Sequence, residues 1–143
     1  MSEAIAERFR AQVGERFRFL EDRGFRRSPE DEEASPVGVS VAYAGRHVGF
    51  LVSYDVRDQA VDVRVTRARA GRLAMTGEGG YSRNLLSHLV EYAGYRGGFG
   101  RRHAGAPPPP GAGWEVTLAD WTDLLEREGG MLLADDAGSL PVQ

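Results

Sequence analysis

The chain has 143 residues, of which 41% are hydrophobic and 27% are charged, and its formal net charge is −3. These values are typical of one globular domain that buries a sizeable core without a disulfide or a metal. Cysteine is absent, which excludes disulfides, thiolate nucleophiles and cysteine-based metal sites. No apolar run reaches the ~20 residues of a membrane span, and no secretory leader is recognisable, so we expect a cytoplasmic protein.

The ionised residues are unevenly distributed along the chain. All 18 basic residues are arginine, whose planar guanidinium pairs well with carboxylates and phosphates. Residues 34–113 hold ten arginines against five acids, whereas residues 114–143 hold one arginine against seven acids. This segregation predicts surfaces of opposite charge that either neutralise each other or face a partner.

The chain is expected to begin with an amphipathic helix, because apolar residues recur there at steps of four and three: Ile5, Phe9, Val13, Phe17 and Leu20. Ser2 is the predicted N-cap, and Gly24 the predicted stop, with Phe25 folding back on the last turn. Residues 26–36 contain two prolines and four consecutive acids, and we expect them to form a mobile, solvated loop.

Three segments with alternating apolar residues follow, at 37–43, 48–54 and 61–65. The turns between them are short, so neighbouring strands must be antiparallel, because a parallel crossover needs a dozen residues or more. Residues 70–81 are expected to be a loop of small residues. Ser82 is the predicted cap of a second helix whose buried face comprises Leu85, Leu86, Leu89, Val90 and Ala93.

Residues 97–113 are rich in Gly, Ala and Pro and are expected to form a second mobile loop. A third helix is predicted from Thr117, with a stripe of Leu118, Trp121, Leu124 and Leu125. Residues 131–133 form either a fourth short strand or the end of the core. The predicted fold is therefore a single α+β domain over 1–143: an N-terminal helix, a three-stranded antiparallel meander, and two further helices packed on one face.

Residues for catalysis or metal binding are not grouped in any recognisable pattern. His47, His88 and His103 lack the spacing that places two ligands on one helix face, and no serine lies in a nucleophile elbow. Asp55 and Asp58 fit a turn better than acid–base chemistry. We therefore expect no enzyme activity, no metal and no cofactor.

Two charged surfaces are candidate contact sites. One is the turn after the second strand, with Tyr54, Asp55, Arg57 and Asp58, and the other is the acidic face of the third helix, with Asp120, Asp123 and Glu126. An acidic face attracts a cationic partner and disfavours the binding of negatively charged proteins. An exposed sheet edge would also allow two copies of the chain to pair.

The arginines support an alternative, anion-binding function. Arg64, Arg67 and Arg69 run from the third strand into its exit loop, and Arg101 and Arg102 lie in a Gly- and Phe-containing segment that is typical of RNA-binding sequences. Nucleic acid is the less favoured partner, because the sequence pI is about 5.6.

The order of elements, with a Val-rich meander and the Tyr54–Asp58 turn, resembles small bacterial immunity-type proteins that neutralise toxins. The resemblance covers residues 5–95 in pattern and implies a non-enzymatic, cytoplasmic protein that binds another protein. It transfers no site residue. The leading hypothesis is a protein-binding module of this inhibitor or immunity kind, and the alternative is a nucleic-acid or nucleotide binder.

Overall fold

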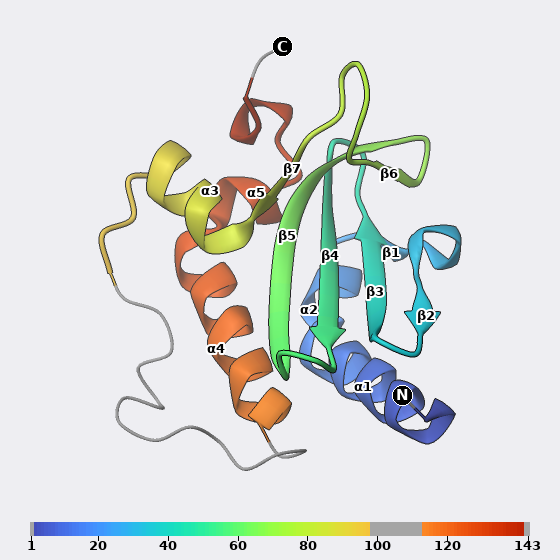
Figure 1. Ribbon diagram of the computed structural model, residues 1–143. Coiled ribbons are helices and arrows are strands. Elements are labelled where there is room, and N and C mark those ends of the chain that lie inside the picture. The colour runs from blue at the N-terminus through green and yellow to red at the C-terminus, as the bar shows by residue number, and fades with distance from the viewer. Residues whose placement is uncertain (1, 98–112, 142–143) are drawn as a thin grey trace.

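The computed structural model describes residues 2–97 and 113–141. The chain forms an N-terminal helical segment, then a curled antiparallel sheet, then further helices (Figure 1). This order agrees with the predicted α+β class, although the sheet contains more strands than the three-stranded meander that we expected.

The N-terminal helix forms for the reasons that the sequence indicates, but it is interrupted. Helix α1 (Glu3–Arg16) begins at Ser2, whose hydroxyl accepts a hydrogen bond from the Ile5 N–H at 3.2 Å. Helix α2 (Arg18–Asp22) follows after a one-residue break. The predicted stop is confirmed, because Gly24 has a φ of +96° and the Phe25 N–H donates to the Leu20 carbonyl at 3.0 Å.

The predicted meander is present as strands β3 (Gly38–Ala44), β4 (Val48–Asp55) and β5 (Ala60–Arg69). All neighbouring strands are antiparallel, and the register pairs Val41 with Val52 and Val52 with Val63. These valines therefore lie on one face of the sheet, where they contribute to the core.

Four short strands extend this sheet on both sides. Strands β1 (Arg26–Arg27) and β2 (Ala34–Ser35) pair with β3, and β6 (Arg72–Ala74) and β7 (Ser82–Asn84) pair with β5. The expectation of a plain loop over 70–81 was therefore wrong for β6. Ala70 and Gly71 have φ angles of 52° and 77°, so they form a two-residue turn of the type I′ kind that joins β5 to β6.

The acidic segment after β1 is also more structured than the predicted loop. It contains β2 and the 3-10 turn η1 (Pro29–Asp31). The Arg27 guanidinium donates to both carboxylate oxygens of Glu32 at 2.6 and 2.7 Å, and Glu32 accepts a third hydrogen bond from the Ala42 N–H at 3.0 Å. Glu32 therefore anchors the segment to β3, and the mobility of residues 26–36 stays a prediction.

Asp31 joins η1 to β6, two segments that are about forty positions apart in the sequence. Its carboxylate accepts hydrogen bonds from two nitrogens of the Arg72 guanidinium, both at 3.0 Å, from the Leu73 N–H at 2.9 Å, and from the Ser28 hydroxyl at 2.6 Å. We call this group of four residues the Asp31 clasp. It fastens the curl of the sheet, because η1 contacts β3 while β6 extends β5.

The helices after the sheet are α3 (Leu85–Tyr92), α4 (Gly113–Glu128) and α5 (Gly130–Leu133), followed by the 3-10 turn η3 (Ala137–Ser139). The cap of α3 is Asn84, not Ser82: its side chain accepts from the N–H groups of Leu86 and Ser87. Helix α4 begins earlier than Thr117. Residues 131–133 form a helical turn instead of a strand. Most of the predicted mobile loop at 97–113 lies outside the described residues.

The buried face of α3 also differs from the prediction. Leu85, His88 and Leu89 are buried, whereas Val90 and Ala93 are exposed. By contrast, the predicted stripe of α4 is confirmed, since all four of its residues are buried.

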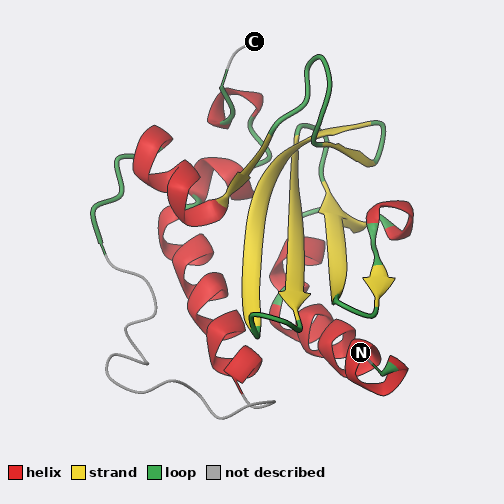
Figure 2. Ribbon diagram, viewed as in Figure 1, coloured by secondary structure: helices red, strands yellow, loops and turns green. Residues whose placement is uncertain are grey.

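The main core lies between one face of the sheet and the helices; in Figure 2, α2 and part of α1 lie behind the strands and α4 stands beside β5. Trp114 at the start of α4 packs edge-on against Tyr54 with ring centroids 5.0 Å apart. Farther along, the Trp121 indole donates to the Val61 carbonyl at 3.2 Å. Helix α4 thus covers the side of β5 near Val61, which protects that part of the strand edge from pairing with another chain. Self-association through another edge stays a prediction.

Candidate functional site

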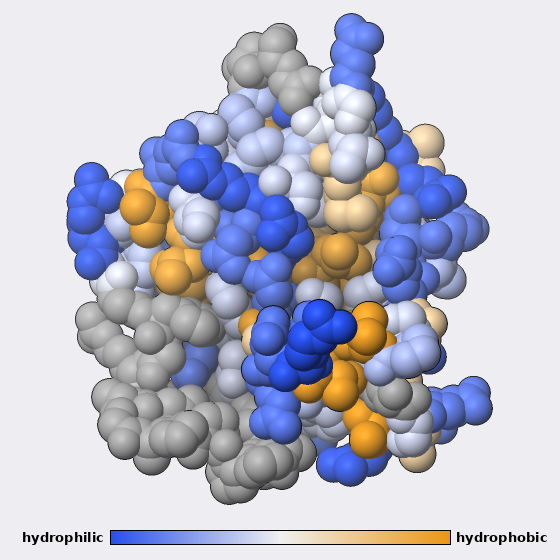
Figure 3. Space-filling model, in the orientation of Figure 1, coloured by the Kyte–Doolittle hydropathy of each residue, from blue (hydrophilic) through white to orange (hydrophobic). Residues whose placement is uncertain are grey.

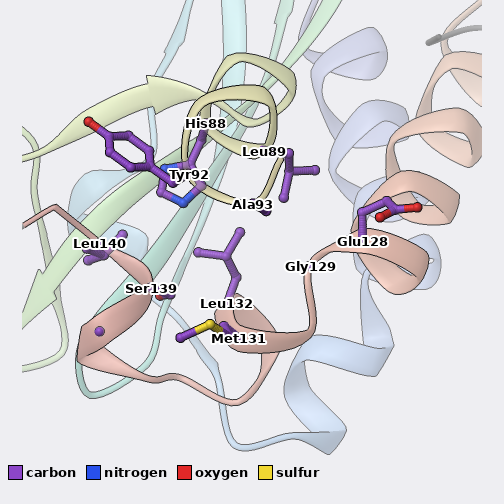
Figure 4. A pocket seen from close by; sticks show the side chains of 11 residues that line it. His88, Leu89, Tyr92, Ala93, Glu128, Gly129, Met131, Leu132, Ser139 and Leu140 are labelled. Carbon is purple, nitrogen blue, oxygen red and sulfur yellow. The ribbon is translucent and has the colours of Figure 1, made fainter. Parts of the chain in front are cut away.

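A pocket opens between α3, the end of α4, α5 and η3 (Figure 4). Its volume is about 410 Å³, within the range of sites that bind small molecules or the anchoring side chains of a partner. The lining is mostly apolar and comprises His88, Leu89, Tyr92, Ala93, Glu128, Gly129, Met131, Leu132, Gly138, Ser139 and Leu140. Figure 4 shows Leu132 pointing from α5 toward α3.

Local sequence features bring these segments together. Asn84 turns the chain from β7 directly into α3. Gly129 separates α4 from α5, and the Asp136 side chain caps η3 by accepting from the Gly138 N–H at 2.8 Å. Asp135 then ties this part of the chain to the β3–β4 turn, because its carboxylate accepts from the N–H groups of His47 and Val48 at 2.9 and 2.8 Å.

His88 lines this pocket, and it is only 2% exposed. Its Nδ1 lies 2.8 Å from the Tyr81 hydroxyl, and it also forms a hydrogen bond with the backbone of Ser139. Burial lowers the pKa of His88 below its ordinary value, outweighing the Ser139 hydrogen bond that raises it, and the positive charge of Arg83 lowers it further. A neutral imidazole with both these partners holds α3 against η3 and the segment before β7.

The rim of the pocket carries two large exposed apolar side chains. Tyr92 is 46% exposed and Met131 is 56% exposed, and they come from α3 and α5 respectively. Glu128, also exposed, lies at the lip on the side of α4. The Arg83 guanidinium pairs with Glu91 and lies 6.0 Å from the centre of the Tyr92 ring, so its charge is already compensated. We call Tyr92, Met131, Glu128 and the pocket between them the α3–α5 surface.

The predicted acidic face of the third helix is only partly a surface. Asp120 is buried, at 8% exposed, which corrects its assignment to the outer face. Asp123 is half-buried and pairs with Arg127 at 3.1 Å. Glu126 is exposed and lies two residues before Glu128, which lines the pocket, so it is the predicted acid nearest to the α3–α5 surface along α4.

The predicted contact turn lies at the other end of α4. Tyr54 is only 9% exposed, because its ring packs between Phe9 and Trp114, and it offers little contact surface. Asp55 accepts from the N–H groups of Arg57 and Asp58 at 2.8 and 3.1 Å, as expected of a turn-forming aspartate.

Arg57 and Asp58 are exposed, and Asp55 lines a recess of about 210 Å³ beside β2 and β3. Trp114 and Glu128 are separated by about 20 Å along α4 at 1.5 Å per residue. The structure therefore does not unite this turn with the acidic end of α4, and the turn stays a separate predicted contact.

The three described arginines of the alternative hypothesis do not converge on one point. Arg64 donates to the Ser82 hydroxyl at 2.8 Å, Arg67 to the Pro141 carbonyl at 2.8 Å, and Arg69 to the Gly79 carbonyl at 2.8 Å. Each guanidinium thus stabilises a different segment of this chain. Arg101 and Arg102 lie outside the described residues, and anion binding by these arginines stays a prediction.

The prediction from the sequence included Leu89 and Ala93 of the α3–α5 surface but not His88, Tyr92 or Met131, although a signal for His88 and Tyr92 existed. Leu85, His88, Leu89 and Tyr92 recur at steps of three, one and three, which is the spacing of one helix face. The prediction kept Leu85 and Leu89 of this face, but it chose Leu86, Val90 and Ala93 by hydrophobicity and left out His88 and Tyr92. Met131 carried no comparable signal, because its exposure depends on how α5 packs.

Within residues 2–97 and 113–141, no group of three or more histidine, aspartate or glutamate side chains is arranged to hold a metal ion. No helix in the same residues has the length and apolarity to cross a membrane. Comparisons with protein-family models, with curated proteins and with solved structures find no match for this chain.

Proposed function

We propose that this protein is a non-enzymatic protein-binding module of the inhibitor or immunity kind, and that the α3–α5 surface is its docking site. The observation that carries the proposal is the exposure of Tyr92 and Met131 at the mouth of a pocket of about 410 Å³. Single exposed apolar residues are common on soluble proteins. Two of them at the opening of an apolar pocket form the arrangement in which a partner buries an anchor residue.

The residue types at the surface support docking. Aromatic residues and methionine are enriched at protein interfaces, and methionine adapts its shape to a partner because its side chain is unbranched. Figure 3 shows hydrophobic residues over α3 at the left of the view, bordered by hydrophilic ones, and Val90 of this helix is 43% exposed. Helix α3 therefore exposes a further apolar side chain besides Tyr92 of the pocket rim.

The polar groups of the pocket support a role in protein binding more than a role in catalysis. His88 is engaged with Tyr81 and Ser139, and the Ser139 hydroxyl donates to the Asp136 carbonyl at 2.6 Å. A histidine and a serine that hold the fold in this way do not form the nucleophile–base pair that acyl-transfer enzymes need.

The proposal is tested by affinity capture from the native host, followed by measurement of the dissociation constant with the purified partner. We expect the wild-type chain to bind one specific protein, and Met131→Glu to weaken that binding at least tenfold, because a charge would enter the apolar contact. Val37→Glu is the matched control, since Val37 is 54% exposed on the segment between β2 and β3. Circular dichroism checks that both variants fold.

Two results would contradict the proposal. One is a partner whose affinity is the same for Met131→Glu and wild type. The other is a wild-type chain that recovers no protein but is retained on DNA, RNA or nucleotide at low salt, which would favour the arginine hypothesis.

A further inference from the structure

We infer that the partner segment recognised by the α3–α5 surface carries a large apolar side chain next to an arginine or lysine. This inference rests on the proposed function and adds the chemistry of the partner. It combines the floor of the pocket, which selects the apolar group, with the charge at its lip, which selects the cation.

The floor of the pocket selects an apolar group. Leu89, Leu132 and Leu140 are between 1% and 4% exposed and contribute apolar lining. His88 is kept neutral by burial and has hydrogen-bond partners within the chain. A polar side chain entering this space would lose its hydration with few groups to replace it, whereas an apolar one would lose nothing.

The lip of the pocket carries the negative charge of Glu128, which no described residue compensates. Glu126 lies two residues earlier in α4 and outside the pocket lining; both glutamates are exposed, and neither forms an ion pair with a described residue. The nearby arginines have acidic partners already: Arg83 pairs with Glu91, and Arg127 pairs with Asp123. The unpaired charge beside the pocket is therefore acidic, which favours a cationic group on the partner.

The position of these two glutamates in α4 supports the same conclusion. Helix α4 ends at Glu128, so Glu126 and Glu128 lie in its last turn. The carboxyl end of a helix dipole is negative, and acids there reduce helix stability instead of increasing it. The stability of α4 therefore does not explain why two glutamates lie at this end of the helix. A cation that docks beside the pocket would meet the Glu128 carboxylate and the negative end of α4, and Glu126 would add longer-range attraction at low salt.

The test is a selection of peptides from a random 12-residue phage library on the immobilised wild-type chain. Peptides that also bind Met131→Glu are removed, so that the remaining ones depend on the α3–α5 surface. The dissociation constants of synthetic copies are then measured for wild type, for Glu126→Gln/Glu128→Gln, and for Glu7→Gln/Glu15→Gln. The last variant removes the same charge from exposed positions of α1.

We expect the selected peptides to share an aromatic or large aliphatic residue with an arginine or lysine within a few positions of it. Neutralising Glu126 and Glu128 should weaken their binding about three- to tenfold at low salt, and this difference should shrink as salt is added. The α1 control should change the affinity less than twofold.

The possible failures are distinguishable. Met131-dependent peptides that lack a basic residue, or that bind Glu126→Gln/Glu128→Gln as tightly as wild type, would overturn this inference and leave the proposed function intact. If no selected peptide depends on Met131, the proposed docking site and the inference fail together.

Discussion

Replacing Asp31 by Asn tests whether the Asp31 clasp holds the curled sheet together. The pKa of Asp31 is lowered from 3.8 to about 2: burial alone would raise it, but the hydrogen bonds from Arg72, Ser28 and the Leu73 N–H outweigh burial. The difference of about 1.8 corresponds to at most about 2.4 kcal/mol, at about 1.36 kcal/mol for each pKa unit. The Arg72 side chain is 49% exposed, so water screens its pairing with Asp31, and we expect about 1–2 kcal/mol.

The stabilising effect of Asp31 should depend on pH. A carboxylate whose pKa is lower in the folded state than in the unfolded state stabilises the fold above pH ~4, and this contribution is lost as the pH falls toward 2. Urea unfolding of Asp31→Asn at pH 7 should therefore show a loss of about 1–2 kcal/mol. Between pH 4 and pH 2, wild type should lose more stability than this variant does.

Asp22→Asn is the control, because Asp22 is exposed on α2 and its side chain forms no hydrogen bond or ion pair with a described residue. Equal stability of Asp31→Asn and Asp22→Asn at pH 7, with parallel losses in acid, would refute the reasoning.

Three further substitutions probe other features. Gly14→Ala should raise the free energy of unfolding by about 0.5–1 kcal/mol in urea melts, because a methyl group there meets no atom within 4 Å and alanine favours the helix; a loss would show that α1 needs glycine at this position. Ala70→Asn should raise the melting temperature, because asparagine tolerates the φ of 52° at the first position of the turn; no change would indicate a different turn. Below about pH 6.5 the wild type should lose stability, because the unfolded state takes up a proton at His88 more readily than the buried imidazole does. His88→Gln should remove this part of the pH dependence. An unchanged pH profile of the unfolding free energy would mean that His88 titrates normally.

The central part of the fold was predictable because local patterns determine it. The valines of β3, β4 and β5 alternate strictly, and the turns between them are too short for anything but antiparallel pairing. The stop at Gly24 also depends on local chemistry, since glycine adopts a positive φ at little cost.

The short strands were not predictable in the same way, since contacts distant in sequence create them. Strand β2 has two residues, and the neighbouring Glu32 is anchored by Arg27 and by the backbone of Ala42. Strand β6 is fastened to η1 through Asp31. No periodicity within either segment indicates these partners.

The candidate site also combines residues that local sequence predicts with residues that depend on distant contacts. The acidic end of α4 could be recognised from the sequence, and Glu126 is exposed as expected. The burial of Asp120 could not, because it depends on how α4 rests against its neighbours. The pocket itself exists only where α3, α5 and η3 meet, three elements that are too short to show an amphipathic pattern beyond one or two turns.

The most direct test of the central claim is a hydrogen-exchange footprint of the chain with and without its bound protein partner. We expect slower amide exchange on binding in residues 88–93 and 129–133, where the α3–α5 surface lies, and unchanged exchange at the β4–β5 turn. Protection confined to residues 55–60, with no change in α3 and α5, would contradict this expectation and would identify the turn as the docking site.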